Sequence, residues 1–285
     1  MITPHATALT FGTFVAPPVP VVTSDLPPGQ SSRAWSPIAA TLIAGERDAV
    51  LVDPLMTIAQ GRALADWIAA SGKNLTTVYV THGHGDHWFG MGSIRERYPR
   101  VRAVATALVV EHMRQQVLSK TFAARWESRF PGLIQHDVAV AEPLSDLHIE
   151  LEGNELVVVE VGHTDTDNTT VLHVPSLGLV VAGDVAYSDV HLYFAESDHD
   201  RRLEWIRALD VIAALQPRAV VAGHKRAGRA DDPKIIGETR TYIRDFDRIA
   251  EHTRTAAELY EQMLSVYPDR VNPGSLWSSA RAEKG

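Results

Sequence analysis

Three histidines and one aspartate fall within six positions of the chain, in the stretch THGHGDHWFG at residues 81–90. The stretch directly follows the apolar run TTVYV, which predicts a short buried strand. His82 and His84 stand two positions apart, so at an extended strand end their side chains point the same way. Asp86 and His87 follow a glycine, where a turn would aim this second pair at a nearby point. Imidazole and carboxylate groups in this pattern indicate a site for zinc or another divalent metal.

The same kind of position recurs three times further along the chain. His163 follows the apolar run LVVVEVG, Asp184 follows LGLVVAG, and His224 follows RAVVAG, each directly after a glycine. Such a glycine permits a sharp turn and a close approach of the backbone. A single histidine in this position would more often be an ordinary residue of a polar loop. Four strand ends that all deliver His or Asp instead predict one convergent metal site.

With these residues the chain resembles the metallo-β-lactamase-fold hydrolase superfamily, over roughly residues 35–230. The H-x-H-x-D-H motif of that family corresponds to residues 82–87. The resemblance implies an α/β fold, an αβ/βα four-layer sandwich, with the site in a groove at one edge of two sheets. It also implies two divalent ions, with zinc favoured and manganese or iron as alternatives. The implied ligands are His82, His84 and His163 for the first metal, Asp86, His87 and His224 for the second, and Asp184 as a bridge.

A centre of this kind implies hydrolysis. Two cations about 3.5–4 Å apart lower the pKa of a bridging water toward neutrality, which supplies hydroxide at neutral pH. We expect this hydroxide to attack an acyl or phosphoryl centre that one metal polarises. Asp86 is a candidate to guide the proton to the leaving group.

Several residues bear on the substrate through the same resemblance. A bridging carboxylate at Asp184 is usual for the lactonase, thioesterase and phosphodiesterase branches. Tyr187 stands where acyl-homoserine lactonases carry a tyrosine that can hydrogen-bond the substrate carbonyl or oxyanion; the alternative is a tyrosine packed beneath the site. Trp88 and Phe89 depart from the H-x-G-G of thioesterases. These features slightly favour a lactone as substrate.

Other side chains are candidates to line the cleft. The candidates for an apolar wall are Trp35, Trp88, Phe89, Tyr193 and Phe194, with Trp35 and Trp88 favoured, although aromatic residues at strand ends more often belong to the core. His191 is a further candidate, with an ordinary loop histidine as the alternative. Lys225 is a candidate to attract a substrate carboxylate, with a solvated lysine as the alternative.

The elements that position these residues alternate in type. Short apolar runs predict a hairpin at residues 38–53 and β structure through residues 147–184, and helical periodicity predicts helices at residues 57–72 and 200–215. This order predicts two sheets covered by outer helices. We expect one domain over residues 1–285, with its core at 35–230, a helical C-terminal extension at 233–285, and a short mixed tail from Asp269. The segment at residues 16–37 holds six prolines, and its part at residues 23–37 is a candidate rim or lid over the cleft.

Composition excludes several classes of protein. The chain has 285 residues, a net charge of −8 and no cysteine, which argues against nucleic-acid or anionic-membrane binding and leaves only N and O ligands for a metal. No apolar run is long enough to span a membrane, and the N-terminal residues 1–22 lack the pattern of a signal peptide.

A cytoplasmic location is the default expectation. A homodimer through the C-terminal helices is an alternative to internal packing.

The sequence therefore predicts a metal-dependent hydrolase of a small ester-like or lactone substrate. The alternatives are a phosphodiesterase or thioesterase of the same fold, a non-haem iron oxidoreductase of the same fold, and an inactive protein that only binds a ligand.

Overall fold

The computed structural model describes residues 6–285, apart from the side chain at position 119, and within them eleven strands form one continuous hydrogen-bonded sheet. The first five residues of the N-terminal segment considered above lie outside the described part. The strand order is β8-β7-β6-β5-β4-β13-β12-β11-β10-β9, with β1 paired to β4. Their bounds are β1 Thr10–Ala16, β4 Ile38–Ala44, β5 Asp48–Val52, β6 Asn74–Tyr79, β7 Arg102–Ala105, β8 Glu142–Pro143, β9 His148–Leu151, β10 Asn154–Gly162, β11 Thr169–Val174, β12 Leu179–Ser188 and β13 Ala219–Lys225.

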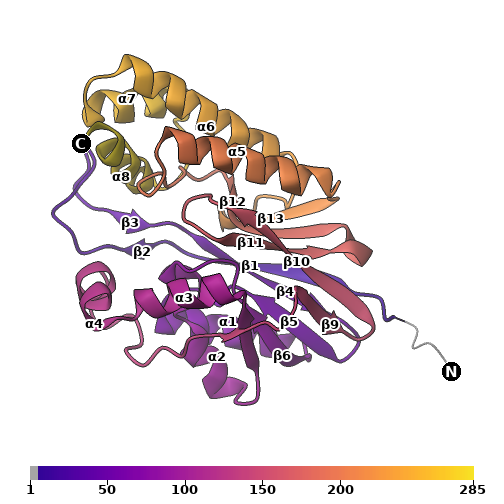
Figure 1. Cartoon of the computed structure of the whole chain (residues 1–285). Coiled ribbons are helices and arrows are strands. Elements are labelled where there is room, and N and C mark those ends of the chain that lie inside the picture. Colours follow the sequence, from indigo (N-terminus) through magenta and orange to yellow (C-terminus); the bar gives the residue numbers. More distant parts are fainter. Residues whose placement is uncertain (1–5) are drawn as a thin grey trace.

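Helices cover both outer faces of this folded sheet (Figure 1). The first half of the chain contributes α1 Ile58–Ala70, α2 Met91–Arg97 and α3 Ala107–Gln116. The second half contributes α5 His199–Ala214, α6 Ile235–His252, α7 Ala256–Val266 and α8 Pro273–Lys284. Shorter turns are η1 Gly85–His87, α4 Ser119–Thr121, the π-helical turn η2 Phe122–Glu127 and η3 Pro175–Leu177.

Three apolar cores hold these layers together. Strand residues alternate between faces, so Leu42 and Leu51 pack against α1–α3 while Ile43 and Val50 face the other half of the sheet. A third core joins β11–β13 to α5–α8 around residues such as Phe246. Helix, sheet, sheet and helix thus form four layers, which confirms the predicted αβ/βα sandwich.

The two halves of the sheet are joined at a single backbone pairing, between Ile38 of β4 and His224 of β13. The sequence predicted two separate sheets, and this pairing makes them one. The parallel strand pairs β5–β6 and β12–β13 lie on either side of the junction. Because the carboxyl ends of parallel strands meet at one edge, the segments that follow β6, β12 and β13 converge there.

The predicted hairpin and helices are present, but the two ends of the chain differ from expectation. The stretch at residues 10–16 is a strand, although its alternation was not recognised. The tail predicted to be mixed forms α8, because Pro273 occupies its first turn, where a missing N–H costs nothing. Within the described residues, no helix is long and apolar enough to cross a membrane.

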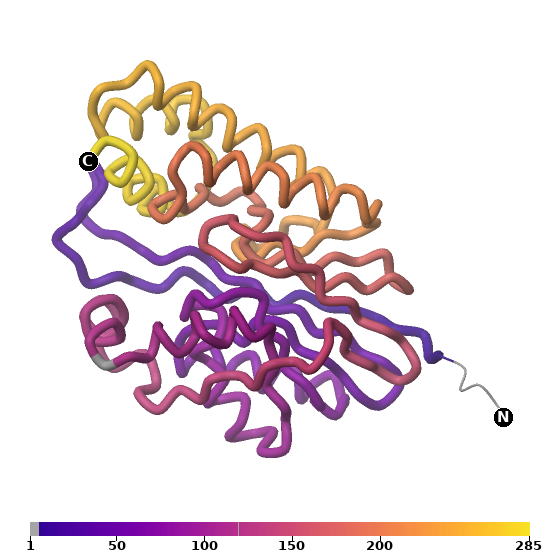
Figure 2. Tube along the Cα trace, in the orientation of Figure 1, coloured from indigo at the N-terminus to yellow at the C-terminus, as the bar shows by residue number. Residues whose placement is uncertain are grey.

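The proline-rich segment lies against α8, as the chain trace in Figure 2 shows. It contains the short ribbon of β2 Val19–Pro20 and β3 Ala34–Trp35. Arg33 donates to the carbonyl of Gly274 at 2.7 Å, and Trp277 donates to Asp25 at 2.9 Å. The segment is therefore held by the C-terminal helix at the edge of the sheet where the functional residues meet.

Candidate metal centre

Glycines let the backbone approach the functional side chains closely. A Cβ at Gly223, directly before His224, would lie 2.2 Å from Asp184 Oδ1 and 3.0 Å from His87 Cε1. Gly183, before Asp184, has a φ of +51°, and a Cβ there would lie 2.6 Å from the Thr81 hydroxyl. Both positions require glycine, as the pattern of glycine before each polar residue predicted.

One group of potential ligands gathers around Asp184. His87 Nε2 lies 3.3 Å from Asp184 Oδ1, and His224 Nε2 lies 3.2 Å from Asp184 Oδ2. Asp86 Oδ2 lies 3.5 Å from His224 Nε2 and 3.7 Å from His87 Nε2. These four side chains are at most 6% exposed. The atoms of Asp86, His87 and His224 are close enough together to share one metal ion.

A second group forms around His82 and His84. Asp165 Oδ2 lies 2.7 Å from His84 Nδ1 and 3.8 Å from His82 Nε2. These three residues also form a set that could hold a metal ion. Two adjacent sets of imidazole and carboxylate donors suit zinc and similar divalent cations.

Unsatisfied buried atoms show that the donors fit such cations. Among the described residues, five buried atoms without a hydrogen-bond partner lie in these two groups: His82 Nε2, both ring nitrogens of His87, Asp165 Oδ2 and Asp184 Oδ1. Buried polar atoms normally have a hydrogen-bond partner. Several unpaired nitrogen and oxygen atoms in one place therefore indicate that another partner binds there. Divalent metal ions would satisfy these atoms.

The charges of the groups lead to the same conclusion. Burial alone would lower the pKa of His84, but Glu196 and Asp165 raise it to about 10. Burial also opposes the charged form of His87, but Asp184 and Asp86 raise its pKa to about 9. The carboxylates therefore demand positive charge in a buried space, which protons or metal cations can supply.

Neighbouring residues orient these ligands. The Tyr187 hydroxyl donates to Asp184 Oδ2 at 2.6 Å, and the Trp35 indole donates to Asp86 Oδ2 at 2.8 Å. Asp53, which sequence reasoning missed, accepts from the Thr81 hydroxyl at 2.8 Å and lies 3.4 Å from His87 Nδ1. Asp53 also follows an apolar strand, but it lacks the glycine that directly precedes His163, Asp184 and His224.

His163 is the one expected ligand that the structure does not bring into either group. Its Nδ1 lies 2.8 Å from Asp167 Oδ1, and its Nε2 lies 2.8 Å from the Ser197 hydroxyl. Asp165 occupies the place beside His82 and His84 instead. Two acidic residues follow His163 in HTDTD, but nothing in the sequence distinguished Asp165 as the inward-facing residue.

Tyr187 lies beneath the site rather than in the cavity. It is 1% exposed, and its hydroxyl is already bonded to Asp184. Burial and the Asp184 carboxylate raise its pKa well above the usual value for tyrosine. The structure thus corrects the expectation of a direct contact with substrate and makes Tyr187 a residue that positions Asp184.

Three of the five proposed wall residues are buried in the apolar cores: Trp88, Phe89 and Phe194. Trp88 is fully buried and donates to the Gly83 carbonyl at 3.0 Å. Phe89 is 1% exposed and packs edge-on against Trp126 at 5.0 Å between ring centroids. Both belong to the core under α1–α3 and do not line the cavity, because the turn after Gly85 directs them inward. Trp35 and Tyr193 line the cavity as expected.

The structure also corrects the placement of His191 and Lys225. His191 is fully buried, and its Nδ1 lies 2.8 Å from the Tyr242 hydroxyl in the core under α5–α8. Lys225 is 3% exposed and forms an ion pair with Asp231. Neither lines the cavity beside the ligands.

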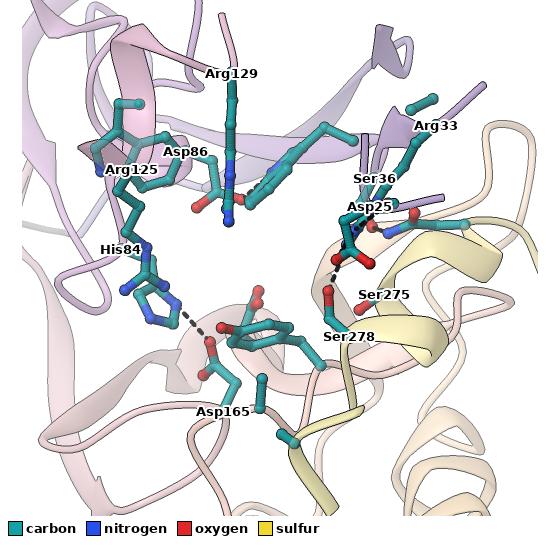
Figure 3. A pocket seen from close by; sticks show the side chains of 18 of the residues that line it. Asp25, Arg33, Ser36, His84, Asp86, Arg125, Arg129, Asp165, Ser275 and Ser278 are labelled. Atoms are coloured by element: carbon teal, nitrogen blue, oxygen red, sulfur yellow. Dashed lines mark hydrogen bonds and ion pairs between the residues drawn. The ribbon is translucent and has the colours of Figure 1, made fainter. Parts of the chain in front are cut away.

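A cavity of about 370 Å³ opens above the two groups (Figure 3). His84 and Asp86 line it on one side, and Arg125 and Arg129 reach toward it from η2 and the turn that follows. The rings of Trp35 and Trp126 also line it. Sequence reasoning missed these arginines because no local pattern relates that stretch to the motif.

Comparison with known proteins gives the same fold. The chain aligns in structure with a metallo-beta-lactamase family protein of Thermus thermophilus, with a TM-score of 0.63 and 22% identity over 95% of this chain and 91% of that chain. A metallo-beta-lactamase of Pontibacter korlensis aligns with a TM-score of 0.56 and 18% identity over 82% of this chain and 100% of the other. The FIM-1 metallo-beta-lactamase of Pseudomonas aeruginosa, solved in a mono-zinc form, aligns with a TM-score of 0.57 and 16% identity over 85% and 98%.

No curated protein sequence matches the chain. The sequence profile of the metallo-beta-lactamase superfamily matches residues 33–224, a range that begins before β3 and ends on the last histidine of the site. The match covers more than half of the chain and contains both groups of donors. The chain therefore belongs to the metallo-beta-lactamase superfamily.

Proposed function

We propose that the protein is a hydrolase that uses two divalent metal ions to cleave a small ester or lactone. The observation that carries this proposal is the pair of buried donor sets, which adjoin where the His82 and His87 rings lie 4.4 Å apart between centroids and which share one cavity. Metal ions bound there would polarise the scissile carbonyl and lower the pKa of a shared water.

The residues of the chain would prepare the site for this chemistry. Tyr187 holds one oxygen of Asp184, which leaves Oδ1 directed toward His87. Trp35 holds Asp86 Oδ2 and at the same time covers one side of the cavity. Asp86 lines the cavity, so its carboxylate is placed to pass a proton to a leaving oxygen.

The size of the cavity favours a small substrate. A volume of about 370 Å³ suits a small organic molecule. Residues 25–36 and α8 form one rim of the cavity and are held together by hydrogen bonds, which favours a small molecule over a long polymer. Trp35 and Trp126 offer apolar surface for the part of the substrate that does not react.

One arginine of the cavity favours a substrate with an anionic group. Four arginines line it: Arg33, Arg125, Arg129 and Arg281. Arg33 and Arg281 are paired with Asp25, and Arg125 with Glu196. The Arg129 guanidinium forms no hydrogen bond and no ion pair within residues 6–285, leaving aside the side chain at position 119. In Figure 3 it points into the cavity between Asp86 and the rim.

Arg129 is therefore placed to bind a carboxylate on a substrate whose ester carbonyl lies at the metal ligands. The same arginine would receive the anionic phosphate of a phosphodiester, so a phosphodiesterase is the second candidate. Asp184, beside His87 and His224, would serve as a ligand in either case.

A panel of chromogenic substrates tests the proposal. Purified protein loaded with zinc or manganese would be given lactones and aryl esters with and without a carboxylate, a thioester, a cephalosporin and a phosphodiester. We expect the highest kcat/KM for a carboxylate-bearing ester or lactone. Robust phosphodiester turnover without any ester cleavage would favour the second candidate, and no turnover of any substrate by the metal-loaded protein would contradict the proposal.

A further inference from the structure

We infer that Asp165, and not His163, completes the first set of metal ligands with His82 and His84. The inference rests on the proposed two-metal centre, and it changes the ligand set that resemblance to the superfamily implies. It concerns which side chain of the loop between β10 and β11 faces the metal.

Asp165 has the geometry of a ligand that binds through one oxygen. Its side chain is 1% exposed. Its Oδ1 accepts a hydrogen bond from the Thr164 hydroxyl at 2.9 Å, which fixes the carboxylate plane. Its Oδ2 has no hydrogen-bond partner among the described residues and lies beside His84 Nδ1 and His82 Nε2. One oxygen is thus held by the protein, and the other is presented to the two imidazoles.

His163 does not have a free nitrogen in this arrangement. The Ser197 hydroxyl donates its only proton to the Thr164 carbonyl, at 2.8 Å. His163 Nε2 lies 2.8 Å from this Ser197 hydroxyl, so that nitrogen faces away from His82 and His84. The other nitrogen, Nδ1, lies against the Asp167 carboxylate.

The backbone explains why Asp165, and not His163, faces His82 and His84. The pairing of β10 with β11 shifts register between Glu160 and Gly162, which indicates a bulge at the end of the strand. Bulges near strand ends redirect the side chains that follow them. A tight turn then closes from Thr164 N to the Thr166 carbonyl at 2.9 Å. After the bulge and the turn, Asp165 points into the cavity and His163 points toward α5.

The exchange has chemical consequences. Replacement of a neutral imidazole by a carboxylate adds one negative charge to the first set. It also makes the set a harder ligand environment, because an oxygen atom replaces a nitrogen atom. A set of two histidines and one carboxylate is suited to Fe(II) and Mn(II) as well as to zinc. The first site should therefore discriminate less strongly in favour of zinc than a site with three histidines.

Metal stoichiometry tests the inference without any measurement of turnover. Asp165→Ala, Asp165→Asn and His163→Ala would be purified, loaded with zinc or cobalt, dialysed, and analysed for metal per chain and for affinity by chelator competition. We expect both Asp165 variants to lose one of the two ions and His163→Ala to keep both. Asp165→Asn conserves size, so it reports on the ligand even if Asp165→Ala fails to fold.

The opposite pattern, in which His163→Ala loses an ion while Asp165→Asn keeps both, would overturn the inference. Loss of an ion from both variants, or from neither, would also overturn it. The visible spectrum of the cobalt-loaded proteins provides a second readout, which should change in the Asp165 variants and stay the same in His163→Ala. A wild-type protein that holds two ions but cleaves no ester would contradict the proposed function and leave this assignment intact.

Discussion

The indole Nε1 of Trp35 donates a 2.8 Å hydrogen bond to Oδ2 of Asp86, across 51 positions of sequence. The same oxygen faces the imidazoles of His87 and His224 at 3.7 and 3.5 Å. Trp35 also packs against Trp126 and Phe130, with ring centroids 5.6 and 5.4 Å away. One side chain therefore both lines the cavity and fixes the orientation of a proposed ligand.

Trp35→Phe should weaken metal binding at the second set, because Asp86 loses the donor that orients it. Loss of a hydrogen-bond partner that orients a metal ligand typically lowers metal affinity or activity by about 10–100-fold. Chelator competition on the zinc-loaded protein would measure the affinity. Trp67→Phe is a matched control, since Trp67 is a half-buried indole that packs on Phe14 of β1. Equal affinities in both variants would show that the hydrogen bond does not orient Asp86 for a metal.

His82→Ala and Asp184→Asn should reduce metal content and activity together, since each removes a donor from the proposed centre. Bound metal stabilises the folded state by mass action, so the Tm of these variants should also be lower than that of the metal-loaded wild type. Treatment with a chelator should lower the Tm of the wild type and have less effect on the variants. Elemental analysis with thermal unfolding measures both effects, and unchanged stoichiometry in both variants would refute the assignment.

Arg129→Met should raise KM for a carboxylate-bearing substrate by about 10-fold or more, the loss expected for a hydrogen bond to a charged group. KM for the neutral methyl ester of the same substrate should change little. Arg129→Lys should recover part of the loss because it keeps the charge without the planar fork. Steady-state kinetics on the matched pair of substrates tests this. An equal rise in KM for both substrates would point to a structural role for Arg129.

Phe89→Ala should destabilise the fold by about 3–5 kcal/mol, the usual cost of truncating a buried phenylalanine. KM of the folded protein should stay unchanged, because Phe89 packs in the core and does not line the cavity. Urea denaturation and kinetics give the two values, with Phe89→Leu as the milder variant. A large change in KM with little loss of stability would restore Phe89 as a wall of the cavity.

Glu152→Gln should lower stability in a pH-dependent way. The Glu152 carboxylate accepts hydrogen bonds of 2.7 Å from the backbone N–H groups of Asp48, Arg47 and Glu46, which lower its pKa from 4.5 to about 2. A depressed folded-state pKa contributes stability above the unfolded value, and this contribution is lost as the pH falls from about 4.5 to about 2.

The unfolding free energy of the wild type should therefore exceed that of Glu152→Gln at neutral pH, and the difference should shrink below about pH 4.5. Chemical denaturation at several pH values measures the difference. Glu111→Gln is the control, because Glu111 makes only an exposed ion pair with Arg114 on α3. A difference that does not vary with pH would contradict the role of the carboxylate.

Local patterns were sufficient to predict the four-layer fold and the histidines and aspartates of the motif. Alternating and helical apolar periodicities determine which face of an element is buried, and these are readable within a few residues. The motif at residues 82–87 is also local, and each later donor follows its own strand and glycine. Six of the seven expected ligands lie in the two groups, and only His163 does not.

Tertiary structure alone decided the direction of several side chains. Trp88 and Phe89 entered the core because the turn after Gly85 rotates them away from the cavity, and sequence spacing does not specify that rotation. Asp165 displaced His163 because a bulge shifts the register at the end of β10. The sequence by itself thus determined which residue types meet at the edge of the sheet. Only the packing of distant segments decided which atoms face the cavity, because the direction of a side chain depends on the backbone turns and neighbours around it.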